Sequence, residues 1–161
     1  MFQVRAAFSE QLDLRTTAER AREFFGDLKN FVELIPGVER ITAEGAGVMR
    51  WLIRAEIPVI GPVRHAFPVE RAADAPGRIE WSPARGEKKN FLRYWASFEE
   101  HDGGVTRVRL EQRVELRREH ARELHPLAGL VGEGRLSAEL QARLGEMMRA
   151  FLASARASLE K

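Results

Sequence analysis

The order of apolar and polar positions divides the chain into a strand, a short helical region, a long run of strands and a final helix. Residues 2–14 alternate, with Phe2, Val4 and Phe8 on one face and mostly polar neighbours on the other. This period of two predicts a half-buried β-strand. Glu10 is the one charged residue on the inward face of that strand.

Two short helices are expected after this strand. Thr16 is followed three residues later by Glu19, which is the spacing of a capping box at a helix start. A second helix over 28–34 is expected to end before Pro36, because the residue preceding a proline is disfavoured in helical conformation. Gly37 then permits the chain to reverse.

Between residues 38 and 116 the period returns to two, and Gly61-Pro62 predicts a turn. Strands are expected over 48–57, 63–69, 78–82, 91–100 and 105–116. The last of these is the clearest, because its inward positions run from Thr106 to Leu116 while every alternate residue is charged. A strand with one polar face is typical of an antiparallel sheet that has one face in water.

The segment 118–134 contains Pro126 and three glycines, and we expect it to be the most mobile part of the chain. Ser137 is expected to cap a long final helix. Eight apolar residues form a broad stripe along that helix: Leu140, Leu144, Met147, Met148, Phe151, Leu152, Ala155 and Leu159.

Composition narrows the classes of protein that fit. The chain has 161 residues, of which 44% are apolar, and the uninterrupted pattern predicts one domain over 1–161. The absence of cysteine excludes disulfides, thiolate zinc sites and iron–sulfur clusters. A net charge of +2 is not typical of nucleic-acid binding. No apolar run approaches a membrane span, so we expect a cytoplasmic protein without stable membrane insertion.

The predicted order of elements resembles the helix-grip fold of the superfamily that contains START lipid-transfer domains, birch-pollen-allergen proteins and polyketide cyclases. The segment 24–41, FFGDLKNFVELIPGVERI, looks like the start of carbon-monoxide-dehydrogenase G-like and START-like members. The resemblance implies an α+β fold in which a curved antiparallel sheet of six to seven strands wraps around the C-terminal helix. It also implies an apolar cavity between sheet and helix.

Several large inward-facing side chains stand where this resemblance places the cavity lining. Apolar residues with a few polar groups are typical of ligand pockets, although such residues also form ordinary cores. The expected lining is Phe31, Leu34, Trp51, Ile53, His65, Phe67, Trp81, Tyr94, Gln112, Met147 and Phe151. We expect neither a cofactor nor a metal site here.

Polar residues with inward parity need partners, because an unpaired buried polar group costs about 1–3 kcal/mol. His65, Gln112, Thr106 and Glu10 are the residues concerned. They could bond one another, hold water or meet a ligand. An acid–base pair of His65 with Tyr94 or Glu10 is chemically feasible, but no nucleophile or phosphate motif accompanies it.

These observations predict binding or transport of a hydrophobic or amphipathic small molecule, such as a lipid, a quinone or a polyketide-like compound. One alternative is an interaction protein with a filled core and no ligand. The other is a polyketide-cyclase-like or hydrolase-like enzyme. Trp95 has outward parity and would need cover from a loop or a partner chain, so a homodimer is also considered.

Overall fold

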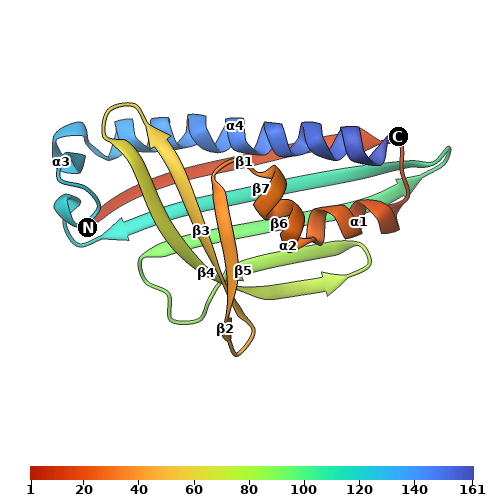
Figure 1. The fold of residues 1–161 in the computed structure, drawn as a ribbon, viewed down its shortest axis with the longest axis horizontal. Coiled ribbons are helices and arrows are strands. Elements are labelled where there is room, and N and C mark those ends of the chain that lie inside the picture. Colours follow the sequence, from red (N-terminus) through yellow and green to blue (C-terminus); the bar gives the residue numbers. More distant parts are fainter.

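The computed structural model describes residues 1–161, and its strands form one seven-stranded antiparallel sheet in the order β1-β7-β6-β5-β4-β3-β2. The strands are β1 (Phe2–Leu14), β2 (Val38–Gly45), β3 (Val48–Ile57), β4 (Gly61–Ala75), β5 (Arg78–Pro83), β6 (Asn90–His101) and β7 (Val105–Arg118). With the long C-terminal helix, this sheet is the α+β helix-grip architecture that the sequence predicts (Figure 1).

The helices lie on one side of the sheet. The helix α4 (Glu133–Leu159) runs along β1, and α1 (Ala18–Gly26) and α2 (Leu28–Leu34) follow the far end of that strand (Figure 1). The short helices η1 (Ala121–Glu123) and α3 (Ala128–Val131) lie near the N-terminus. No helix has both the length and the hydropathy that crossing a membrane requires.

Side chains of α4 cover the free edge of β1. Residues one helical turn apart on α4 accept hydrogen bonds from alternate backbone N–H groups of the strand. The three bonds run from Gln3 N to Glu133 Oε2 (3.3 Å), from Arg5 N to Ser137 Oγ (3.0 Å) and from Ala7 N to Gln141 Oε1 (2.8 Å). An edge strand with unpaired backbone groups invites other chains to pair with it, and α4 blocks that pairing here.

Two predicted helix caps are wrong. Thr17 caps α1 instead of Thr16, because the Thr17 hydroxyl accepts from Arg20 N at 3.2 Å. Thr16 is buried, and its carbonyl accepts from the Thr106 hydroxyl at 2.8 Å. Ser137 caps nothing, since α4 already begins at Glu133 and the Ser137 hydroxyl is committed to β1.

Two smaller expectations also change. Glu10 has inward parity on β1, yet its side chain is exposed. The turn between β3 and β4 precedes Gly61, which is itself the first residue of β4. By contrast, every predicted inward residue of β7 from Thr106 to Leu116 is buried.

Trp95 finds its cover within the sheet. It is half-buried, and the Arg78 guanidinium of neighbouring β5 lies 4.4 Å from the centre of its ring. A cation over an aromatic face is stabilising. Trp95 therefore needs no partner chain to cover it. The homodimer stays a prediction.

Candidate functional site

A small apolar cavity lies between α4 and the inner face of the sheet. Its volume is about 40 Å³, and nine of its eleven lining residues are hydrophobic. The lining comes from β3, β4, β7 and α4: Ile53, Ala55, Val63, His65, Phe67, Gln112, Val114, Leu116, Leu140, Leu144 and Met147. Alternation along each strand explains the set, because all its strand residues share the inward parity.

A second void of about 20 Å³ adjoins the first. The two voids share Val63, His65, Leu116 and Leu140. Ile60 of the turn after β3 and Leu124 of the segment after β7 also line the second void. The cavity therefore extends toward the end of the molecule where η1 and α3 lie.

An open groove borders the cavity on its other side. It has a volume of about 450 Å³ and includes Gly37, Arg54 and Arg143 among its lining. Ala55 and Met147 line both the groove and the cavity, so their side chains form the wall between the two spaces. The charges in the groove are paired, since Arg54 contacts Glu56 at 2.7 Å and Arg143 contacts Glu146 at 3.2 Å.

His65 is the one titratable side chain in the cavity lining. Its Nε2 atom is buried and has no hydrogen-bond partner in the protein. Burial, and to a smaller extent the positive charge of Arg118, together lower the pKa of His65 from 6.5 to about 4. The imidazole is therefore neutral at physiological pH, with one donor and one acceptor nitrogen.

Gln112 is the second polar residue of the lining. It lies in the middle of β7, where it pairs with Phe8 of β1 and Tyr94 of β6. The side chain is only 1% exposed, and its Oε1 atom has no partner in the protein. Two buried polar atoms without partners thus belong to the same small cavity.

The sequence-predicted lining residues separate into two groups. Ile53, His65, Phe67, Gln112 and Met147 line the cavity. The other six, Phe31, Leu34, Trp51, Trp81, Tyr94 and Phe151, lie outside its lining. Six further lining residues were not predicted, although strand parity and the apolar stripe of the last helix indicate them: Ala55, Val63, Val114, Leu116, Leu140 and Leu144.

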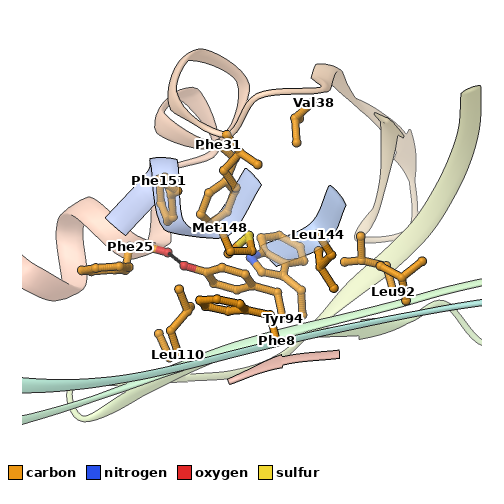
Figure 2. Packing of buried hydrophobic residues seen from close by; sticks show 14 of the residues in the cluster. Phe8, Phe25, Phe31, Val38, Leu92, Tyr94, Leu110, Leu144, Met148 and Phe151 are labelled. Atoms are coloured by element: carbon orange, nitrogen blue, oxygen red, sulfur yellow. Dashed lines mark hydrogen bonds between the residues drawn. The ribbon is translucent and has the colours of Figure 1, made fainter. Parts of the chain in front are cut away.

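Phe31, Trp51, Tyr94 and Phe151 of the second group form an aromatic cluster, of which Figure 2 shows Phe31, Tyr94 and Phe151. The cluster adjoins the cavity, because Trp51 pairs with Phe67 and Tyr94 with Gln112 across neighbouring strands. The Phe31 ring lies 5.0 Å from Trp51, 4.9 Å from Tyr94 and 5.9 Å from Phe151, centre to centre. All four side chains are fully buried. These distances are those of packed aromatic pairs, so this part of the interior is filled.

Tyr94 has a structural partner. Its hydroxyl donates to the carbonyl of Phe25 at 2.7 Å (Figure 2), and burial raises the pKa of this phenol well above its usual value. Phe25 stands at the end of α1, where carbonyls lack partners within the helix. Tyr94 therefore holds α1 on the sheet. The structure brings neither Tyr94 nor the exposed Glu10 into the cavity beside His65.

Metal-binding residues do not gather anywhere in the chain. No three His, Cys, Asp or Glu side chains lie close enough together to hold an ion. His125 Nδ1 instead accepts from the backbone N–H of Leu127 at 3.0 Å.

The fold has many relatives among solved structures, although no protein-family model and no curated sequence matches the chain. The Zhui aromatase/cyclase of a Streptomyces species superposes with a TM-score of 0.69 at 15% identity, covering 97% of this chain and 94% of that one. A Deinococcus radiodurans protein gives 0.62 at 18% identity, covering 96% and 98%. A START superfamily protein of Mycobacterium smegmatis gives 0.53 at 16% identity, covering 86% and 96%.

These similarities concern the fold, because every identity is below 20%. None of the three neighbours is named as a carbon-monoxide-dehydrogenase protein, so the nearer likeness to that family stays a prediction. The cavity between sheet and last helix also stands where the resemblance placed it. The chain has the helix-grip fold of START superfamily and aromatase/cyclase structures.

Proposed function

We propose that the protein binds a small hydrophobic or amphipathic molecule in the cavity between the sheet and α4. The observation that carries this proposal is the lining itself: nine hydrophobic residues surround two polar side chains, His65 and Gln112, that the protein leaves partly unpaired. Ligand pockets typically combine an apolar wall with a few polar groups. The names of the START and aromatase/cyclase neighbours fit such a role.

Binding requires the cavity to widen. Its present volume of about 40 Å³ is far below the roughly 300–1,000 Å³ of drug-sized ligand pockets. Met147 is half-buried and separates the cavity from the open groove. Because a methionine side chain adapts easily to new shapes, a change of its rotamer joins the two spaces and gives the ligand a path from solvent.

The first experiment looks for a ligand that accompanies the protein. Native mass spectrometry of the purified chain should show mass in excess of the polypeptide, and this excess should disappear under denaturing conditions. An organic extract should then contain the released apolar molecule. A bare polypeptide mass, together with no binding of an added apolar fluorescent probe, would contradict the proposal.

A cavity-filling variant tests the location. Val63 lines both voids, so Val63→Phe should fill them and weaken probe binding at least about tenfold. Val48 on β3 has the opposite parity and is absent from the cavity lining. Val48→Phe is therefore a matched control that should leave the probe affinity unchanged. Equal probe affinities of the two variants would place the probe elsewhere.

A second candidate is an interaction protein that binds no ligand. The observation in its favour is the aromatic cluster of Phe31, Trp51, Tyr94 and Phe151, which fills the interior beside the small cavity. The same experiments separate the two candidates, because an interaction protein should give a bare mass and no probe binding.

Catalysis, as in the aromatase/cyclase neighbours, receives less support. A general acid–base mechanism needs groups within reach of one substrate. The Tyr94 hydroxyl is bonded to Phe25, and Glu10 is exposed. His65 is thus left without a titratable partner in the lining, and our proposal is binding without turnover.

A further inference from the structure

The cavity holds two polar atoms whose positions define the chemistry of an occupant. His65 Nε2 and Gln112 Oε1 are both buried, both lack a hydrogen-bond partner in the protein, and both belong to the same eleven-residue lining. The Gln112 side chain is 1% exposed, so bulk solvent does not reach it. Leaving such groups unpaired is unfavourable, and the rest of the lining offers no polar side chain to relieve it.

We propose that the ligand is a neutral molecule with an apolar body and one hydroxyl group, an alcohol or a phenol, whose hydroxyl bonds to Gln112 and His65. This inference rests on the proposed function. A hydroxyl both donates and accepts, so it donates to the Gln112 carboxamide oxygen and pairs with the imidazole nitrogen. One group of the ligand thereby satisfies both orphaned atoms.

Hydroxyl chemistry fits the site better than a charged head group. No carboxylate, Lys or Arg belongs to the cavity lining. A ligand carboxylate would be buried without a cation beside it, and burying an uncompensated charge is costly. The depressed pKa of His65 keeps the imidazole neutral, so it supplies no counter-charge at neutral pH. A ligand without polar atoms would leave both protein groups unpaired.

Three small molecules of similar shape separate these cases. p-Cresol carries the hydroxyl, p-xylene replaces it by a methyl group, and p-toluate replaces it by a carboxylate. Isothermal titration calorimetry at pH 7 should give p-cresol an affinity about tenfold or more above that of p-xylene, which corresponds to one or two net hydrogen bonds. p-Toluate should bind more weakly than p-cresol by at least a similar factor.

Variants tie this preference to the two side chains. Gln112→Met removes the acceptor at similar length, and it should bring the p-cresol to p-xylene ratio toward one. His65→Leu should reduce the ratio as well. Gln11→Met is the matched control, because it makes the same Gln-to-Met substitution at an exposed position of β1. It should leave the affinity ratio at the wild-type value. The wild-type ratio remains informative even where a cavity variant fails to fold.

The outcomes distinguish this inference from the function on which it rests. Equal affinities of p-cresol and p-xylene for the wild type would overturn the hydroxyl site, and so would a preference that survives in Gln112→Met. A bound water that hydrogen-bonds to both His65 Nε2 and Gln112 Oε1 would make the p-cresol and p-xylene affinities equal. In that case only the hydroxyl site would be wrong, and the proposed binding function would be unaffected. Absence of binding by all three molecules, with no co-purified ligand, would overturn both.

Discussion

The side-chain amide of Gln141 in α4 forms two hydrogen bonds with the backbone of a single residue, Ala7 in β1. The Ala7 N–H donates to Gln141 Oε1 at 2.8 Å, and Gln141 Nε2 donates to the Ala7 carbonyl at 2.5 Å. A strand on the free edge of a sheet normally receives this pair of bonds from another strand. Gln141 therefore takes the place of a neighbouring strand and fixes the helix to the sheet above the cavity.

Gln141→Leu should destabilise the protein by about 1 kcal/mol, because two hydrogen bonds are lost and water replaces them in part. Leucine and glutamine have similar helix propensities, so the helix itself is not weakened. The free energy of unfolding in urea measures the effect. Gln141→Glu keeps the acceptor for the Ala7 N–H, so its unfolding free energy should lie between those of the wild type and Gln141→Leu. An unchanged stability of Gln141→Leu would mean that these bonds contribute nothing.

Gly37 lies directly against β3, where its carbonyl accepts a hydrogen bond from Arg54 N at 2.7 Å. Its φ is +94°, and a Cβ atom there would lie 2.5 Å from the Arg54 carbonyl oxygen and 3.1 Å from Met147 Cε. Gly37→Ala should therefore cost about 2 kcal/mol or more in unfolding free energy, from backbone strain plus the clash. Thermal or urea denaturation will measure it.

Gly86 provides the matched control for that substitution. It also has a positive φ, of +81°, but a Cβ there would meet no atom within 4 Å. Gly86→Ala should lower the unfolding free energy by only about 1 kcal/mol, the cost of placing an alanine at a positive φ. Equal losses at the two positions would show that the close approach of Gly37 to β3 has no energetic consequence.

Alternation made most of the sheet predictable from sequence. The inward residues of β6 and β7 are those that parity selects, because a half-buried strand exposes alternate side chains to two different environments. Ser137 shows where local signals fail. Its hydroxyl suits a helix cap, but it equally suits a strand edge, and only the docking of α4 on β1 decides between these roles.

The candidate site was less predictable for a related reason. Parity indicates that Trp51 and Gln112 both face inward, yet it does not indicate which inward side chains touch one another. Trp51 meets Phe31 at 5.0 Å between ring centres and is fully packed, whereas Gln112 borders a void. That difference depends on how α4 crosses the sheet and on the sizes of facing side chains, and neither is encoded in a strand's period.

Tyr94→Phe should destabilise the protein by about 1–3 kcal/mol, because it leaves the buried carbonyl of Phe25 without its donor. Since Tyr94 is absent from the cavity lining, the affinity for an apolar probe should stay within about twofold of the wild type. Urea denaturation and a fluorescence titration measure the two quantities. A large loss of probe affinity at unchanged stability would instead place Tyr94 at the ligand.

The segment that leads into α4 should respond to a ligand. Leu124 lines the second void and Ala128 is fully buried, but Leu130 is 87% exposed, so this part of the chain is only partly anchored. Amides between His125 and Gly134 should exchange with solvent faster than those in the middle of α4, and p-cresol should slow them. Strong protection that is equal with and without ligand would identify a fixed surface element.

His65 gives the protein a specific dependence on pH. Its pKa in the folded state is about 4, lowered by burial and then by Arg118, against an ordinary value of 6.5. Between these two values the unfolded chain binds a proton that the folded chain does not bind. The contribution of His65 to stability is therefore complete above about pH 6.5 and is lost as the pH falls toward 4.

The unfolding free energy should consequently decrease by on the order of 1–3 kcal/mol between pH 6.5 and pH 4. His65→Gln removes the titrating group while keeping a donor and an acceptor, so its stability should change less over this interval. Urea denaturation at several pH values compares the two proteins. Carboxylates such as Asp13, whose pKa is lowered by its hydrogen bond from Arg107, lose their contribution only near or below their ordinary value of 3.8. If both proteins showed the same slope between pH 5 and 6.5, His65 would not be buried in its neutral form, and the polar end of the cavity would have to be open to solvent.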